Sequence, residues 1–387
     1  MRILYVAIDG EVSGGNNICS ILLKAAQKQG YQVELLAPHP GKLTELLDRE
    51  GIQIHFFNLA RSFQFHKSVQ LAFLLKKRDI TLVHTHTTLY RGEILCRIAC
   101  WIAGIPIICH QHDPADIYNQ NPVIFFYQRW LDRITSKIVK QFAAVSKERQ
   151  RLMIQLKGYP RNRVELIYNG IDIESFSSQE SRDSVRSKWF LQQQQIAIGL
   201  IARLEFPKGQ GTLIEAIPDI LNSYPEAKFF IIGDDRFPGQ PCLTQYRRMI
   251  QALKIENSCF LLGFQTNIER LIQGLDIIVL PSWWEGHPLI LLEALAARKP
   301  VIASSVGGTP EIIQHQQTGW LIPPRNPEAL AQAVCAAIAQ PELAQKLADR
   351  GYEYVKEYFD QKQMIAKVLS LYRRIEADGK SSSGNSH

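Results

Sequence analysis

The 387-residue sequence lacks several features that would assign it to a simple class. No apolar run approaches the ~18–20 residues that cross a bilayer, so no membrane-spanning helix is expected. The seven cysteines include no Cys-x-x-Cys pair, which removes the usual signature of a zinc or dithiol site. The glycine-containing segment after the first apolar run is neither GxGxxG nor a P-loop, so neither a nicotinamide dehydrogenase nor a P-loop NTPase is indicated.

The composition is that of an ordinary globular protein, with 46% hydrophobic and 21% charged residues. The length predicts two or three domains, each able to bury a core. The first apolar run stops at Asp9 and is too short for a signal peptide. Together with the scattered cysteines, this predicts a cytoplasmic protein, with peripheral attachment to the inner face of the membrane as an option.

Short apolar segments alternate with helical patterns along the chain, which predicts parallel sheets covered by helices on both faces. The alternation breaks at the polar residues 172–194 and then restarts, so the sequence predicts two α/β domains. Residues 122–157 read as one helical region, and a long helix is expected to break near 358–361. The predicted N-terminal domain, residues 1–178, binds the acceptor, and the predicted C-terminal domain, residues 179–358, binds the nucleotide sugar. Residues 359–378 are expected to form a helix that packs back on the first domain, and residues 379–387 a disordered tail.

The ends of the expected strands in the first half carry glycines and histidines. Gly14 and Gly15 follow the first strand, where a glycine backbone and a helix N-terminus can approach an anion. His112 ends a later strand two residues after His110, and His84 and His86 end an earlier one. A metal cluster is one interpretation of the four histidines, but the sequence fixes no third ligand, so no metal is assigned. His112 is the preferred residue for contact with a ligand.

The second half places cations and carboxylates at equivalent positions. Arg203 and Lys208 follow its first strand, where a guanidinium and an ammonium suit a diphosphate. Glu285 precedes an expected helix that Pro288 begins, and Glu293 lies inside that helix. The amides near Leu289 and Ile290 would face an anion, with the carboxylates accepting hydroxyl groups. A glycosidase pair of carboxylates would need two facing carboxyls instead.

At this point the chain resembles the retaining glycosyltransferases of family 4, over nearly its whole length and in motif order. The resemblance implies a GT-B fold, that is, two doubly wound Rossmann-like domains facing each other across a deep cleft. The motifs that carry it are Gly14–Gly15, His112–Asp113, YNGID at 168–172, ARLEFPKG at 202–209, IIGDD at 231–235, LLGF at 261–264, PSWWEGHPLILLEALAARKPVIAS at 281–304 and GGTPEII at 307–313.

The resemblance also implies roles for single residues. Glu293 would hold the ribose hydroxyls of a nucleotide sugar, and Arg203 and Lys208 would neutralise its diphosphate. Glu285 and His112 would contact the sugar, and Gly14 and Gly15 would line the cleft. The remaining residues expected at the donor are Gly233, Gly263, Phe264, Gly286, Pro288, Leu289 and Ile290.

The implied reaction transfers a sugar to an acceptor hydroxyl with retention of configuration. Fixed cations and amides would stabilise the leaving diphosphate, so no metal and no other cofactor is expected. The sequence has no Asp-x-Asp, which agrees with a metal-free site. Three positions depart from the family: Arg298 replaces a usual glycine and is expected in a left-handed conformation, Asp235 replaces a frequent glycine, and His287 stands where phenylalanine is common.

The positive net charge of +7 lies mainly in the first half. Residues 129–163 contain ten basic and two acidic side chains, together with Trp130, Ile134, Ile138, Phe142 and Met153. A basic amphipathic surface of this kind can bind anionic lipid, and a solvated helix face is the alternative. No nucleic-acid-binding motif is present. The expected partners are therefore a nucleotide-sugar donor and an acceptor glycan, glycolipid or lipid-linked sugar.

Two other functions remain open at this stage. A nucleotide-sugar 2-epimerase has the same fold and needs no acceptor. A protein that binds the nucleotide sugar without turnover would keep the same residues. Analysis of the products formed from donor and acceptor separates the three functions.

Overall fold

The computed structural model describes residues 1–387 except 59–64, 87–89, 113–121, 177–181, 190, 237–238 and 384–387. The chain forms two compact units, one of Met1–Asn169 with Lys362–His387 and the other of Gly170–Gln361. The chain therefore passes from the first unit to the second between Asn169 and Gly170, before the boundary predicted at 178. No helix among the described residues is long and apolar enough to cross a bilayer.

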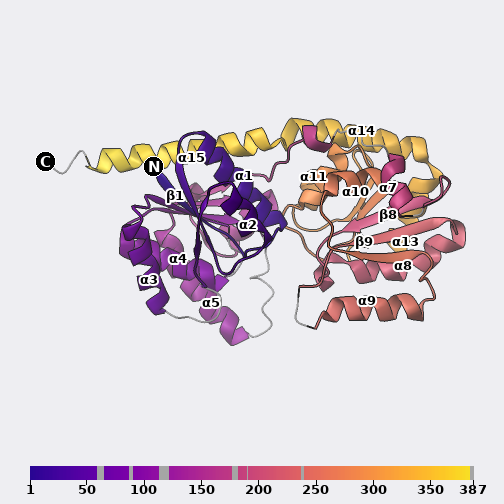
Figure 1. The fold of residues 1–387 in the computed structure, drawn as a ribbon, viewed down its shortest axis with the longest axis horizontal. Coiled ribbons are helices and arrows are strands. Elements are labelled where there is room, and N and C mark those ends of the chain that lie inside the picture. The colour runs from indigo at the N-terminus through magenta and orange to yellow at the C-terminus, as the bar shows by residue number, and fades with distance from the viewer. Residues whose placement is uncertain are drawn as a thin grey trace. The chain divides into compact units, whose positions relative to one another are not determined.

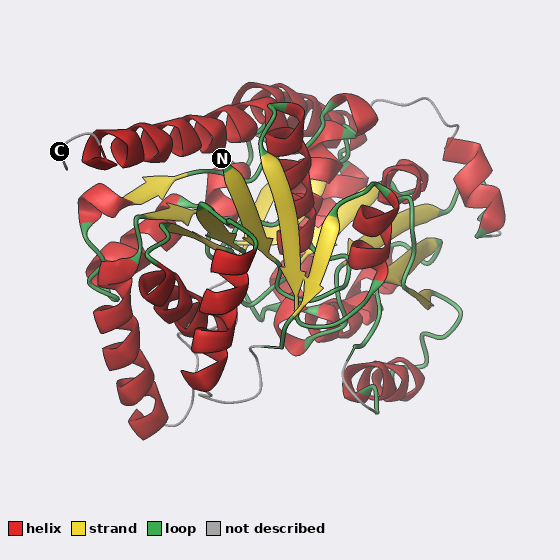
Figure 2. Ribbon diagram, turned by 60° about the vertical axis from the view of Figure 1, so that its left-hand side comes forward, coloured by secondary structure: helices red, strands yellow, loops and turns green. Residues whose placement is uncertain are grey.

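The first unit contains a seven-stranded parallel sheet in the order β3-β2-β1-β4-β5-β6-β7. Helices cover both of its faces (Figures 1 and 2). Its strands are β1 Arg2–Val6, β2 Gln32–Ala37, β3 Gln53–Phe56, β4 Leu82–Thr85, β5 Ile107–Gln111, β6 Gln141–Ala144 and β7 Val164–Leu166. Its helices are α1 Gly14–Lys28, α2 Lys42–Arg49, α3 Phe65–Lys77, α4 Tyr90–Ala103, α5 Pro122–Thr135, α6 Lys147–Gln155 and α15 Gln361–Ser383, with 3-10 turns η2 Ser136–Ile138 and η3 Arg161–Arg163.

The second unit contains a six-stranded parallel sheet in the order β10-β9-β8-β11-β12-β13. Its strands are β8 Ile196–Ile201, β9 Ala227–Ile232, β10 Cys259–Gly263, β11 Ile277–Leu280, β12 Val301–Ser304 and β13 Trp320–Ile322. Its helices are α7 Arg182–Lys188, α8 Gln210–Ser223, α9 Pro241–Ala252, α10 Ile268–Gly274, α11 Leu289–Ala296, α12 Thr309–Ile312, α13 Pro327–Ala339 and α14 Pro341–Tyr358, with 3-10 turns η4 Glu174–Phe176 and η5 Phe206–Lys208.

The order in which the chain adds strands reverses at one point in each parallel sheet, between β1 and β4 in the first and between β8 and β11 in the second. The side chains on both faces of these sheets are apolar because helices bury them. Phe229 and Leu213 belong to one such buried cluster. In doubly wound sheets, ligands bind outside the carboxyl ends of the strands at the reversal. The topology therefore points to the loops after β1, β4, β8 and β11.

The two segments that join the units are bonded to each other within the second unit. Ile171 N–H donates to Phe359 O at 3.0 Å, and Gln361 N–H donates to Ile171 O at 2.9 Å. Gly170 permits this approach, because a Cβ there would lie 2.7 Å from the Cα of Gln361. The YNGID motif is thus hydrogen-bonded through its backbone to the residues where α14 ends and α15 begins. The break between these two helices confirms the break that was predicted near 358–361.

The C-terminal helix α15 belongs to the first unit. Tyr372 on this helix is fully buried, and its hydroxyl lies 2.7 Å from that of Tyr5 on β1. The helix continues to Ser383, into the segment predicted as a tail, while 384–387 lie outside the described residues.

Two sequence predictions about local structure have clear outcomes. Arg298 has φ +54, so the predicted left-handed conformation is confirmed, and its side chain bonds Asp349 and lies over the Tyr352 ring. The single helical region predicted at 122–157 is wrong, because strand β6 divides it between α5 and α6. Its residues Phe142 and Ala144 are buried core, and a short buried strand has no periodicity that separates it from a helix.

Candidate active site

In the second unit, the predicted cations and carboxylates follow the two strands that flank the reversal. Arg203 and Lys208 lie in the loop after β8, and Glu285 lies in the loop after β11. The two strands pair directly, with Ile198 opposite Ile277. The parallel pairing brings loops together that are 77 residues apart in the sequence.

Lys208 and Glu285 form the centre of this arrangement. Lys208 Nζ lies 2.9 Å from both Oε1 and Oε2 of Glu285. Ser282 Oγ donates to Glu285 Oε1 at 2.8 Å. Glu285 is buried and Lys208 partly so, which strengthens the attraction relative to an exposed pair. A cation and a carboxylate held at one point can meet both the phosphate and the hydroxyl groups of one substrate.

Two glycines allow the surrounding loops to pack closely. Gly209 has φ +78, and a Cβ there would lie 2.0 Å from Pro281 O. Gly307 has φ +54, and a Cβ there would lie 1.7 Å from Glu285 O. Trp283 N–H donates to Pro207 O at 2.8 Å, joining the Lys208 loop to the Glu285 loop. The backbone therefore fixes the positions of Lys208 and Glu285 with little freedom.

Arg203 has a different partner from Lys208. Its Nη1 lies 3.0 Å from Glu205 Oε1, and 40% of its side-chain surface is exposed. Gln210 Nε2 donates to Arg203 O at 2.7 Å, which holds the backbone of this loop. An exposed guanidinium at the edge of the sheet can turn toward a ligand with little loss, since surface ion pairs contribute about 0–1 kcal/mol.

The other residues expected at the donor lie along the same edge of the sheet. Gly233 follows β9 and has φ +145, where a Cβ would lie 1.9 Å from Ala202 O. Gly263 ends β10 with φ +66, where a Cβ would meet no atom within 4 Å, and partly buried Phe264 follows it. Gly286 follows Glu285, Pro288 is the N-cap residue of α11, and Leu289 and Ile290 are the first residues of that helix.

Glu293 is in the second turn of α11 and is half-buried. Burial, with a smaller contribution from Glu269, raises the pKa of Glu293 to about 7. Its carboxyl group therefore changes charge near neutral pH.

Asp235, one of the departures from the family, and two residues that sequence reasoning missed also have defined places. Asp235 Oδ2 accepts the N–H groups of Cys242 and Leu243 at the start of α9, so the carboxylate supports a helix. Ser282, which bonds Glu285, and Arg325, whose guanidinium lies 4.1 Å from the centre of the Trp283 ring, were not predicted. The tryptophan pair in PSWWEG was the signal for an aromatic surface here.

In the first unit, the structure brings together Gly15 and His112. Gly14 begins α1, and a Cβ on Gly15 would lie 3.5 Å from His112 Cδ2 and 2.7 Å from Ile8 Cδ1. Buried Asn16, which the sequence analysis did not select, accepts from Ile8 N–H and donates to Asp9 Oδ1. Asp113 of the His112–Asp113 motif lies outside the described residues.

The four histidines form one stack at the ends of β4 and β5. The centres of the His110 and His112 rings are 4.6 Å apart and those of His86 and His112 are 5.2 Å apart. His86 Nδ1 and His112 Nε2 lie 2.9 Å apart, and His84 Nδ1 lies 2.6 Å from Tyr372 Oη. Burial lowers the pKa of all four imidazoles, that of His112 to about 3. The imidazoles are therefore neutral at physiological pH.

Three of these histidines could in principle hold a metal, since ligand atoms of His84, His86 and His110 lie within 4.8 Å of one another. The rings of His84 and His110 are nearly parallel, at 8°. His84 Nε2, His86 Nε2 and both ring nitrogens of His110 have no hydrogen-bond partner among the described residues, and no metal is assigned to them.

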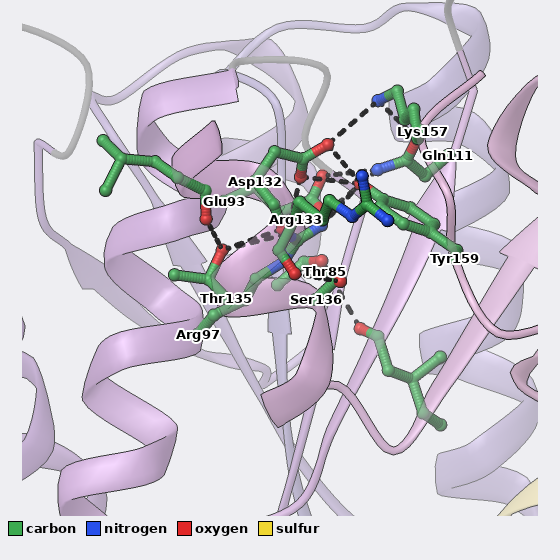
Figure 3. A network of polar contacts seen from close by, with 12 residues as sticks. Thr85, Glu93, Arg97, Gln111, Asp132, Arg133, Thr135, Ser136, Lys157 and Tyr159 are labelled. Atoms are coloured by element: carbon green, nitrogen blue, oxygen red, sulfur yellow. Dashed lines mark hydrogen bonds and ion pairs between the residues drawn. The ribbon is translucent and has the colours of Figure 1, made fainter. Parts of the chain in front are cut away.

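A buried polar network includes Gln111 of β5 (Figure 3), whose side chain lies on the opposite face of the strand from that of His110 because side chains alternate along a strand. Arg97 bonds Glu93 and lies 2.7 Å from Asp132, and Tyr159 donates to Asp132 at 2.6 Å. Gln111 Nε2 donates to Glu93 Oε1 at 3.0 Å, and Gln111 Oε1 accepts from Arg149 and Lys157. Burial opposes ionisation of Asp132, but the neighbouring cations hold its pKa below its usual value. The network joins α4 and α5 to β5, the strand that ends immediately before His112.

The basic stretch 129–163 does not form the single amphipathic surface that the sequence predicts. Phe142 and Met153 are fully buried in the core, which corrects that part of the prediction. Trp130 and Ile134 of the stretch are exposed instead. Together with Phe126, which precedes the stretch, they lie four residues apart on α5, with 53%, 46% and 74% of their surface exposed, respectively.

Comparison with known proteins identifies the two units. The family described as Glycosyl transferases group 1 matches residues 181–354, and Glycosyltransferase Family 4 matches residues 12–175. The UDP-Gal:alpha-D-GlcNAc-diphosphoundecaprenol alpha-1,3-galactosyltransferase of Escherichia coli is 25% identical over 331 residues, which cover 83% of this chain and 84% of that protein. The putative glycosyltransferase EpsF of Bacillus subtilis (strain 168) is 24% identical over 396 residues, which cover 96% of each.

Solved structures have the same fold. Anabaena HepE in complex with UDP and glucose has a TM-score of 0.83 at 22% identity, over 96% of this chain and 99% of that one. WaaG, a glycosyltransferase involved in lipopolysaccharide biosynthesis, has a TM-score of 0.76 at 15% identity, over 95% and 99%. The predicted GT-B fold is confirmed. Since the family matches together take in both units, the chain belongs to the glycosyl transferases of group 1.

Proposed function

We propose that the protein transfers a sugar from a nucleotide-diphosphate donor to an acceptor hydroxyl with retention of configuration and without a metal. The observation that carries this proposal is the buried contact between Lys208 and Glu285 at the reversal of the second sheet. The donor is the substrate of this unit, and the product belongs to a glycan or glycolipid.

The proposed mechanism assigns each group to a charge or a hydroxyl. Breaking the glycosyl–phosphate bond places negative charge on the diphosphate, which Lys208, Arg203 and the first amides of α11 stabilise more in the transition state than in the ground state. Glu285 orients the sugar hydroxyls and Glu293 the ribose. The acceptor attacks from the face that the diphosphate leaves, and a phosphate oxygen takes its proton.

The relatives support a nucleotide-sugar donor and a lipid-linked or glycan acceptor. The E. coli relative is named for UDP-Gal and a diphosphoundecaprenol acceptor, and the HepE structure contains UDP and glucose. We therefore place UDP-sugars first in the tests below.

The experiment incubates the protein with UDP-sugars, with and without lipid-linked and glycan acceptors, in excess EDTA, and analyses the products by NMR. Transfer with retained anomeric configuration is expected. An epimer formed from the donor alone would indicate the 2-epimerase, and no product would indicate a binder. Loss of transfer in EDTA with recovery on adding Mg²⁺ would contradict the metal-free mechanism.

Glu293 predicts a pH dependence of donor binding. Because its pKa is raised to about 7, the carboxylate is present above pH 7 and is neutralised below it. Charge-assisted hydrogen bonds to ribose are stronger, so affinity should fall by up to about tenfold per pH unit below 7. Calorimetry with a nucleotide sugar, whose diphosphate diester does not titrate in this range, measures the effect. Glu293→Gln should bind more weakly with a flat profile, and an equally steep profile in that variant would remove Glu293 from the ribose site.

We also propose that α5 attaches the protein peripherally to anionic membrane on the cytoplasmic side. Exposed Phe126, Trp130 and Ile134 recur every fourth residue, beside exposed Arg129 and Arg133. Aromatic side chains favour the bilayer interface, and each nearby cation adds about 1 kcal/mol on anionic lipid.

Sedimentation with phosphatidylglycerol vesicles tests this attachment. The wild type should bind at low salt and dissociate at high salt, and Phe126→Ser/Trp130→Ser should bind much less. Leu343→Ser, which changes an exposed apolar residue of α14 in the other unit, is the matched control and should bind normally. Equal binding by the double variant and the wild type would refute the role of α5.

A further inference from the structure

We propose that the carboxylate of Asp9 binds a sugar hydroxyl in the first unit, through Oδ2, the oxygen that the protein itself does not use. Asp9 follows β1, which ends at Val6, where the order of strands in the first sheet reverses. Doubly wound sheets bind ligands at this position. The proposal rests on the proposed function, because sugar transfer is what brings a hydroxyl group to this loop.

The loop that carries Asp9 is fixed to helix α1 by the side chain of Asn16, which is fully buried. Asn16 Oδ1 accepts the N–H group of Ile8 at 3.0 Å. Asn16 Nδ2 donates to Asp9 Oδ1 and to Glu11 O, each at 2.7 Å. The amide oxygen thus meets a donor and the amide nitrogen meets acceptors, so these contacts allow one orientation of the amide. The side chain of Asn16 therefore holds the loop at three successive points.

Helix α2 holds the same loop from a second side. Gly10 O accepts the N–H group of Leu43, in the first turn of α2, at 2.9 Å. A Cβ on Gly10 would lie 2.3 Å from His39 O, so the lack of a side chain permits this close approach. Asp9 lies between Ile8 and Gly10, whose backbones are both bonded to neighbouring elements. The backbone position of Asp9 is therefore set by these contacts.

The half-buried carboxylate of Asp9 has one oxygen turned to the protein and one left over. Oδ1 accepts from Asn16 Nδ2 at 2.7 Å and from the N–H group of Glu11 at 2.8 Å. Oδ2 is accessible to solvent, and none of the described residues donates to it or pairs with it. The carboxylate is therefore held in a fixed orientation and presents one unused acceptor.

The chemistry of Oδ2 favours a hydroxyl group over a phosphate. A carboxylate oxygen accepts hydrogen bonds, so it suits an O–H group. Within the described part of the chain, no cation is paired with Asp9 to offset its charge, so a phosphate oxygen would be repelled. Hydrogen bonds to an ionised acceptor are also stronger than those between neutral groups. The hydroxyl can belong to the transferred sugar or to the acceptor, which offer the same chemistry.

Asp9→Asn tests the proposal because it changes Oδ2 and little else. Its amide oxygen can still accept from Asn16 and from the Glu11 N–H group, while an NH₂ group takes the place of Oδ2. The melting temperature should stay near that of the wild type, and kcat/KM for transfer should fall by about 10- to 100-fold, the loss of one hydrogen bond to a charged group. Asp9→Ser, whose hydroxyl can accept only within the loop, should show the same loss. Asp48→Asn, which changes an exposed aspartate of α2, is the matched control and should transfer at the wild-type rate.

Two arms of the experiment assign the hydroxyl to its source. Calorimetry compares the binding of UDP with that of UDP-glucose. Kinetics measures the acceptor KM with octyl glycosides of glucose, galactose and N-acetylglucosamine, beside lipid-linked and glycan acceptors. Weaker binding of UDP-glucose but not of UDP by Asp9→Asn would assign the hydroxyl to the transferred sugar. A higher acceptor KM with unchanged UDP-glucose binding would assign it to the acceptor.

Unchanged UDP-glucose binding together with an unchanged acceptor KM, in whichever Asp9 variant melts at the wild-type temperature, would overturn the proposal. Tighter binding of UDP by Asp9→Asn would also overturn it, because Asp9 would then face the diphosphate. A wild type that neither binds UDP-glucose nor transfers from any nucleotide sugar would refute the proposed function and the hydroxyl site with it. An active wild type with an unaffected Asp9→Asn variant would refute the hydroxyl site alone.

Discussion

Lys208→Ala should lower the rate of sugar transfer by about 10²- to 10³-fold, the usual effect of removing one donor that stabilises a developing anion. Lys208 Nζ lies 2.9 Å from both carboxylate oxygens of Glu285, and the backbone around it is fixed by Gly209. The charge that it neutralises grows as the diphosphate leaves, so kcat should fall more than the donor affinity. Steady-state kinetics with a UDP-sugar measures both.

The same variant leaves Glu285 without its cation, so folding must be measured as well. Lys208→Arg keeps the charge and should retain more activity than Lys208→Ala at a similar melting temperature. Lys346→Ala changes an exposed lysine of α14 and should transfer at the wild-type rate. Wild-type turnover in Lys208→Ala would remove Lys208 from the mechanism.

Gly307→Ala should destabilise the second unit by about 3 kcal/mol or more, a size typical of strain at a constrained backbone position. Gly307 has φ +54, a backbone conformation that a residue with a side chain adopts only with strain. The new Cβ would also lie 1.7 Å from Glu285 O. The backbone of Glu285 must move to relieve this contact, so transfer should fall together with stability. Urea unfolding and kinetics on the same preparation measure the two effects.

Gly211→Ala is the matched control in the same unit. Its Cβ would meet only Met249 Cε at 3.8 Å and Tyr246 Cε1 at 3.9 Å, and its φ is not in the left-handed range. Gly211 lies in helix α8, where alanine is favoured over glycine by about 0.5–1 kcal/mol. Gly211→Ala should therefore be as stable as the wild type or more so. A Gly307→Ala variant of equal stability would show that the loop after β12 does not constrain Glu285.

The sequence placed the candidate residues at the ends of individual strands, where the structure also has them, because parallel sheets place loops at one edge and the motifs follow individual strands. It could not predict that Lys208 and Glu285 are in contact. That contact depends on β11 pairing with β8 although β9 and β10 come between them in the chain. Ser282 was missed for the same reason, since a serine in a loop has no signal until its partner is placed.

Short buried or partly polar strands were the other difficulty. The sequence analysis did not find β3, whose residues Gln53–Phe56 are half polar, or β6, whose residues Gln141–Ala144 lie within a basic helical pattern. The histidines at the ends of β4 and β5 were found one by one. Their stacking, and the bond between His86 and His112, came only from the side-by-side pairing of these strands.

Calorimetric titration of uridine, guanosine and adenosine diphosphates into the protein in excess EDTA tests the central claim most directly. We predict saturable one-to-one binding of one of them, weakened in Lys208→Ala and unchanged in Lys346→Ala. Binding that appears only when Mg²⁺ or Mn²⁺ is added, or binding that is the same in Lys208→Ala, would contradict a diphosphate site built from the protein's own charges.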